Sequence, residues 1–110
     1  MTDPVASYED VTPAEVARGL PGHRLIDVRE SGELVGELGH IAGVELVPLG
    51  ILTTVALPWD RHAPLVMICR SGARSGRATQ ALARMGFTSV HNMVGGMLRW
   101  NAEGLPVERG

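Results

Sequence analysis

Residues 65–75 read LVMICRSGARS, and this stretch decides the fold. Its first four residues are all apolar, which is typical of a short strand covered on both faces of a parallel sheet. Residues 75–85 then place apolar side chains at helical spacing, and Gly86 follows as a natural helix stop. The stretch therefore predicts a central strand, a tight loop from Cys69 to Ser75, and a helix.

The rest of the chain alternates between short strands and helices in the same way. Residues 25–28 form a second run typical of a buried strand. Thr12 is a hydroxyl N-cap followed by proline and a capping-box glutamate, which predicts a helix that ends between Gly19 and Gly22. Weaker strand candidates are residues 44–47 and 89–91, and the candidates for short helices are residues 48–57 and 97–102.

Strands and helices that alternate at this spacing predict an α/β fold, an open parallel sheet with helices on both faces. A chain of 110 residues is near the commonest size of one domain, so we expect residues 1–110 to form a single domain. Ligands of such sheets bind beyond the carboxyl ends of the strands. This rule directs attention to the loop that follows Ile68.

Composition excludes several classes of partner. The net charge is −2 and the ten basic residues, all arginine, are spread along the chain, so we expect no nucleic-acid partner. No apolar run approaches the ~20 residues that cross a bilayer. The first four residues, MTDP, do not resemble the start of an export signal, so we expect no membrane association and a cytoplasmic location. A single cysteine permits no intramolecular disulfide and is compatible with a reducing compartment.

That single cysteine, Cys69, is the candidate nucleophile. It lies between the end of a strand and the start of a helix, where free backbone N–H groups and the positive end of the helix dipole converge. Both effects favour a thiolate and should lower the pKa of the thiol. Gly72 and the small Ala73 let the loop curl tightly, so that successive N–H groups can surround an anion.

Four polar side chains of the loop are candidates for binding the substrate. Arg70 and Arg74 would stabilise the thiolate and attract an anionic sulfur donor, and two cations are otherwise disfavoured at a helix start. Ser71 and Ser75 carry hydroxyls that can donate to an anionic sulfur or, equally, cap the helix.

The loop at residues 69–75 resembles the active-site loop of rhodanese-type sulfurtransferases. Each of the other similar fragments is weak alone, but their order and spacing are highly specific, and together they cover most of the chain. The further fragments similar to that family are LIDVRE at 25–30, GHIAG at 39–43, Pro48-Leu49, Gly86-Phe87 with Val90, GGMLRW at 95–100 and GLPV at 104–107.

The resemblance implies a five-stranded parallel sheet and a persulfide on Cys69, whose outer sulfur is bound by the amides of the loop. The implied activity moves a sulfane sulfur from thiosulfate or a persulfide to a thiol, to cyanide or to a protein acceptor such as a sulfur carrier. Asp27 and Arg29 would then lie near the loop, where they either brace it by charged hydrogen bonds or serve packing alone. We expect no cofactor and no metal, because the histidines show no metal-ligand spacing.

Two other functions stay open. The first is a cysteine phosphatase or arsenate reductase, in which a similar loop holds an oxyanion, but that loop is one residue longer than the spacing from Cys69 to Arg74. The second is a non-catalytic module with the same fold that serves binding or regulation. Retention of Cys69 in an intact loop argues against this second function.

Overall fold

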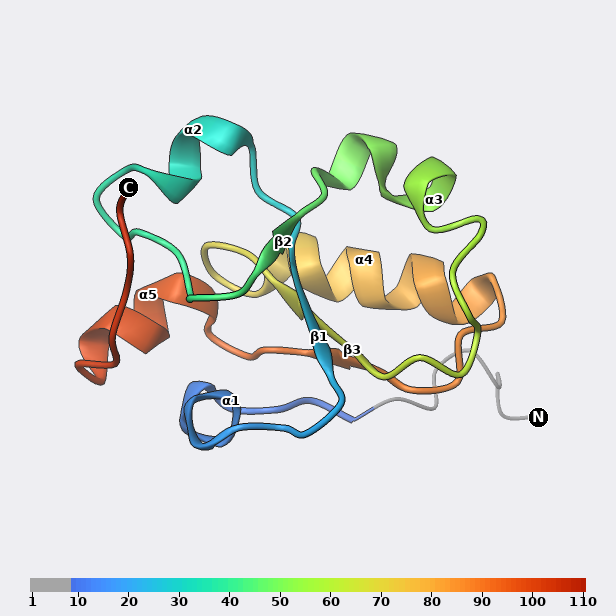
Figure 1. Cartoon of the computed structure of the whole chain (residues 1–110), viewed down its shortest axis with the longest axis horizontal. Coiled ribbons are helices and arrows are strands. Elements are labelled where there is room, and N and C mark those ends of the chain that lie inside the picture. The colour runs from blue at the N-terminus through green and yellow to red at the C-terminus, as the bar shows by residue number, and fades with distance from the viewer. Residues whose placement is uncertain (1–8) are drawn as a thin grey trace.

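A computed structural model describes residues 9–110, so the MTDP segment used in the expectation about export lies outside the described residues. The core is one parallel sheet whose strands run in the order β2-β1-β3-β4 (Figure 1). The predicted open parallel α/β fold is confirmed. The strands are β1 (Arg24–Asp27), β2 (Glu45–Leu46), β3 (Leu65–Ile68) and β4 (Val90–Asn92).

Most helices begin and end close to the positions that the sequence predicts, but α2 (Ser31–Leu34) lies where no helix was predicted. Thr12 caps α1 with the expected capping box, in which its hydroxyl accepts the N–H of Glu15 and its own N–H donates to the Glu15 carboxylate. None of the helices among residues 9–110 has the length and apolar character needed to span a bilayer. The helical elements are α1 (Pro13–Arg18), α2 (Ser31–Leu34), the 3-10 turn η2 (Leu49–Ile51), α3 (Leu52–Val55), α4 (Ala73–Arg84) and α5 (Gly96–Ala102).

Helices cover both faces of the sheet, which explains the unbroken apolar run of β3 (Figure 1). Leu65 and Met67 pack on the face covered by α3 and α4, whereas Val66 and Ile68 pack on the face covered by α1 and α5. All four side chains have no exposed surface. Burial of each contributes at most about 1.5–3 kcal/mol to folding, so this strand anchors the residues that follow it.

The expectation of five strands is wrong for the described residues, which contain four. At the position of a fifth strand, beyond β4, Val11 makes a single parallel bridge to Met93. The ladder does not continue because Thr12 already caps α1 and Pro13, which has no N–H, begins that helix.

Candidate active site

The sulfur of Cys69 lies where the chain passes from β3 into α4. The Sγ atom accepts a hydrogen bond from the backbone N–H of Gly72 at 3.1 Å and another from the hydroxyl of Ser75 at 3.3 Å. Gly72 is the N-cap of α4 and has a φ of 99°, a left-handed conformation that favours glycine. Because α4 is 12 residues long, the sulfur also faces the positive end of a full helix dipole.

The pKa of the Cys69 thiol is lowered by this environment. Burial is the largest influence and raises the pKa, because it disfavours a charged sulfur. Donation from the Ser75 hydroxyl and from the N–H groups of Ser75, Gly72 and Ser71 outweighs burial and lowers the pKa. The net effect favours the thiolate, which is the nucleophilic form of a cysteine.

Cys69 has no exposed surface, and its side chain packs within the apolar cluster on the α4 face. Its sulfur nevertheless lies among hydrogen-bond donors at a helix start, not in a purely apolar environment. A donor or acceptor therefore reaches the sulfur only when neighbouring atoms move.

Ser75 is connected to a residue that the sequence analysis did not identify, Asn92. The fully buried Ser75 hydroxyl lies 2.6 Å from Oδ1 of Asn92, and Nδ2 of the same amide donates to the carbonyl of Gly72 at 3.2 Å. A hydroxyl has one hydrogen, so Ser75 donates either to Asn92 or to the sulfur of Cys69. Asn92 ends β4, next to β3, so the rule about carboxyl ends of strands was the signal that could have found it.

The hydroxyls of the loop do not cap α4, because its N-cap is Gly72 and no side chain provides a cap hydrogen bond. Of the two functions considered for the serines, Ser75 has the donor function, and the N–H of Ser71 contributes to lowering the thiol pKa. Among the described residues, no hydrogen bond is recorded from the N–H of Ala73 to the sulfur. The position of Ala73 as the first residue of α4 fits a tight turn.

The loop rests on the segment that begins α5. The N–H groups of Met97 and Leu98 donate to the carbonyls of Cys69 and Arg70 at 2.8 and 2.9 Å. A Cβ atom on Gly96 would come within 2.5 Å of the Arg70 carbonyl oxygen. Glycine at position 96 therefore allows a close approach of two backbones that holds the loop in place.

The two arginines of the loop have different surroundings. Arg74 forms a two-pronged ion pair with Glu33 of α2, in which both N···O distances are 2.8 Å. This hydrogen bonding lowers the pKa of the Glu33 carboxyl to about 2. The Arg70 side chain is exposed and has no hydrogen-bond or ion-pair partner within residues 9–110. Arg70 is therefore the cation of the loop that is free to bind an anion.

Asp27 and Arg29 form a buried ion pair at the end of β1. The Asp27 carboxylate accepts three short contacts from the Arg29 side chain, at 2.8, 2.9 and 3.1 Å. Arg29 also donates to the carbonyls of Gly39, at 2.8 Å, and Glu33, at 3.4 Å. The recorded bonds thus brace α2 and the segment at Gly39, and none of them reaches the loop itself.

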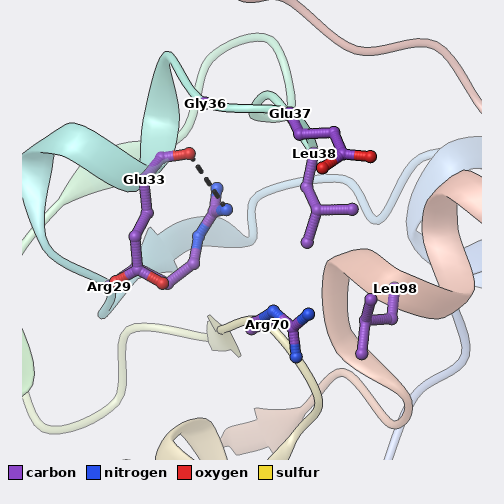
Figure 2. Close-up of a pocket in the computed structure, with 7 residues that line it drawn as sticks. All are labelled: Arg29, Glu33, Gly36, Glu37, Leu38, Arg70 and Leu98. Carbon is purple, nitrogen blue, oxygen red and sulfur yellow. Dashed lines mark hydrogen bonds between the residues drawn. The ribbon is translucent and has the colours of Figure 1, made fainter.

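A pocket of about 290 Å³ opens beside the loop (Figure 2). We call it the Arg70 pocket. No group of three or more His, Cys, Asp or Glu in the part of the chain that the structure describes could hold a metal ion. The lining residues of the Arg70 pocket are Arg29, Glu33, Gly36, Glu37, Leu38, Arg70 and Leu98.

Comparison with known proteins relates this geometry to a family. The chain is 36% identical over 106 residues to the uncharacterized protein YqhL of Bacillus subtilis, covering 90% of this chain and 82% of the relative. It is 34% identical to thiosulfate sulfurtransferase 16, chloroplastic, of Arabidopsis thaliana, covering 81% and 82%. Some other curated relatives are longer, and the chain spans less than half of their length.

A solved structure and a family model agree with these relatives. The crystal structure of a rhodanese-related protein from Thermoplasma volcanium matches with a TM-score of 0.82 at 29% identity, and the match covers 94% of this chain and 100% of that one. The model of the rhodanese-like domain matches residues 12–103, which include every strand and helix described above. With the loop, the sheet and the relatives in agreement, the chain belongs to the rhodanese-like domain family.

Proposed function

We propose that the chain is a sulfurtransferase in which Cys69 carries one sulfane sulfur as a persulfide. The observation that carries the proposal is the hydrogen bonding of Sγ at the start of α4, which lowers the thiol pKa in spite of burial. A sulfur-transfer family fits this arrangement, and one relative is named a thiosulfate sulfurtransferase. The donor is thiosulfate or a persulfide, and the acceptor is a thiol, cyanide or a protein such as a sulfur carrier.

The first step forms the persulfide. The Cys69 thiolate attacks the outer sulfur of the donor, a new S–S bond forms, and the old bond breaks. With thiosulfate, sulfite leaves with the electron pair of that bond. The N–H groups of the loop then stabilise the negative charge on the new terminal sulfur, as they do on the thiolate.

The second step discharges the persulfide. An acceptor thiolate attacks the terminal sulfur, and the Cys69 sulfur leaves with the electron pair and becomes a thiolate again. The same donors that lower the pKa of Cys69 make it a good leaving group. Since Cys69 is the only cysteine of the chain, the acceptor comes from outside it.

In this proposal Arg70 attracts the anionic donor, because its guanidinium has no partner within the described residues. Arg74 acts at longer range. The hydrogen bond to Glu33 is the main cause that raises the pKa of the Arg74 guanidinium, and the nearby Cys69 thiolate raises it further. Arg74 therefore adds positive potential and anchors α2 to the loop.

The proposal is tested by incubating the reduced protein with thiosulfate and measuring its intact mass. We expect an adduct of one sulfur atom, which cyanide removes as thiocyanate. The Cys69→Ser variant should form no adduct. A folded wild-type protein that takes no sulfur from thiosulfate or from a persulfide donor would overturn the proposal and favour the non-catalytic binding module, which the complete burial of Cys69 also fits.

A further inference from the structure

The Arg70 pocket opens beside the loop that carries the reacting sulfur, and Cys69 itself does not line it. Arg70 follows Cys69 in the chain, and Leu98 is fixed to the loop by its N–H bond to the Arg70 carbonyl. On the neighbouring strand Asp27 pairs with Ile68, and the N–H of Val28 donates to the Ile68 carbonyl at 2.9 Å. Arg29 therefore leaves the sheet at the same level as Arg70, and the two arginines line one pocket.

Most charges of the Arg70 pocket are already paired. The Glu33 carboxylate is bound by Arg74, and the Arg29 guanidinium is bound by Asp27 and by backbone carbonyls. Glu37 is different, because its carboxylate has no hydrogen-bond or ion-pair partner within residues 9–110. The Arg70 pocket thus contains one unpaired cation, Arg70, and one unpaired anion, Glu37.

Figure 2 shows how these two charges are arranged. Arg70 and Leu98 lie on one side of the Arg70 pocket, and Glu37 and Leu38 lie on the opposite side. Charged ends on opposite walls, with apolar side chains beside them, are complementary to a small molecule that carries both charges. A volume of about 290 Å³ is at the small end of the range for ligand pockets and suits a molecule of amino-acid size.

Arg70 can attract an anionic donor to the loop, but the Arg70 pocket as a whole is less suited to hold an inorganic dianion. Two of its lining residues, Glu33 and Glu37, are acidic. The Glu33 charge is compensated by Arg74, but the Glu37 charge would repel thiosulfate or sulfite. The balance of one free cation and one free anion favours a molecule with no net charge.

We propose that the Arg70 pocket binds a zwitterionic α-amino thiol, such as cysteine, as the sulfur acceptor. Its carboxylate pairs with Arg70, its ammonium pairs with Glu37, and its methylene lies against Leu38 and Leu98. The acceptor thiolate attacks the outer sulfur of the Cys69 persulfide, and the Cys69 sulfur leaves with the electron pair. This inference rests on the proposed sulfur transfer and assigns the acceptor class.

The test compares four thiols that differ in charge. Cysteine carries both charged groups, mercaptopropionate the carboxylate, cysteamine the ammonium, and mercaptoethanol neither. Protein preloaded with sulfur on Cys69 is freed of donor, and its discharge by each thiol is followed by mass spectrometry. Rates are divided by the thiolate concentration of each acceptor, because the four thiols differ in pKa. We expect cysteine to be fastest and each charged group to contribute about two- to fivefold.

Two variants assign the charges. In Glu37→Gln the rate ratios of cysteine to mercaptopropionate and of cysteamine to mercaptoethanol should fall toward one. In Arg70→Gln the ratios of cysteine to cysteamine and of mercaptopropionate to mercaptoethanol should fall instead. Exposed residues outside the Arg70 pocket provide the controls, and Glu103→Gln and Arg84→Gln should leave all four ratios unchanged.

The outcomes separate this inference from the proposed function. A protein that never takes up sulfur contradicts the sulfurtransferase proposal, and binding is then tested with S-methylcysteine, which cannot accept sulfur. We expect that compound to slow alkylation of Cys69, and to do so less in both pocket variants; no protection would overturn the inference. Two results with sulfur-loaded protein would also overturn the inference. The first is transfer of the sulfur at equal rates to all four thiols, and the second is transfer to a protein cysteine but to none of the small thiols.

Discussion

The sharpest prediction concerns the hydroxyl of Ser75. Ser75→Ala removes the hydroxyl that donates to the Cys69 sulfur at 3.3 Å and keeps the backbone donors, among them the N–H of Gly72 at 3.1 Å. The alanine side chain fits the buried site, because it is smaller than serine. The substitution therefore tests one donor to the sulfur without blocking the loop.

The size of the effect follows from the chemistry of the acceptor. A hydrogen bond to a charged group contributes about 1.5–3 kcal/mol, which corresponds to a change of about ten- to a hundredfold in the thiol–thiolate equilibrium. Ser75 must give up its 2.6 Å bond to Asn92 in order to donate to the sulfur, and this competition reduces the gain. We therefore expect the lower limit, a roughly tenfold smaller thiolate-to-thiol ratio in Ser75→Ala.

The assay is a pH titration of the ultraviolet absorbance of the thiolate, which requires no access of a reagent to the buried sulfur. The Cys69→Ser variant supplies the blank, since it removes the only thiol and keeps the single tyrosine. Ser71→Ala is the matched control, because Ser71 lies in the same loop and its hydroxyl makes no recorded hydrogen bond. An unchanged titration of Ser75→Ala, or an equal shift in Ser71→Ala, would refute the assignment of Ser75 as a donor to the sulfur.

Three further predictions use other contacts of the site. Asn92→Asp replaces an amide that donates to the loop by an acceptor and adds negative charge near the sulfur. The same titration should therefore show less thiolate than in Ser75→Ala. An unchanged titration would mean that Asn92 does not influence the ionisation of the Cys69 thiol. Gly96→Ala, whose Cβ would lie 2.5 Å from a loop carbonyl, should lower the free energy of urea unfolding by about 1–3 kcal/mol more than Gly104→Ala, which has a similar positive φ and open space; equal losses would contradict the close approach. The Arg74 guanidinium lowers the pKa of Glu33 from 4.5 to about 2, so Glu33→Gln should be less stable than the wild type above pH 4.5, and the difference should vanish as the pH falls toward 2; a difference that persists at pH 2 would have another cause.

Most of the fold was predictable because its signals are local. The four successive apolar residues of β3 could be satisfied only by burial on both faces, and the structure places helices there. The capping box at Thr12 and the helix end predicted between Gly19 and Gly22 depend on residues within one helical turn, and the structure has both, with Gly19 as the C-cap. The resemblance implied five strands, whereas residues 9–110 contain four: next to β4 only Val11 forms a bridge, and Pro13, which has no N–H, stops the ladder from continuing toward α1.

The candidate site also has features that depend on local sequence and features that depend on distant contacts. The sequence by itself determined that the single thiol, Cys69, lies between a strand and a helix, because this depends on the order of residues in one loop. Only the tertiary structure decided that the Ser75 hydroxyl lies within hydrogen-bond distance of both Cys69 and Asn92, that Arg74 is held by Glu33, and that the sulfur has no exposed surface. Ser75 and Asn92 are 17 positions apart, and Arg74 and Glu33 are 41 positions apart. At such separations the packing of the helices and strands decides which side chains meet. The chemistry of the loop is therefore local, whereas its accessibility and its free charges depend on the fold.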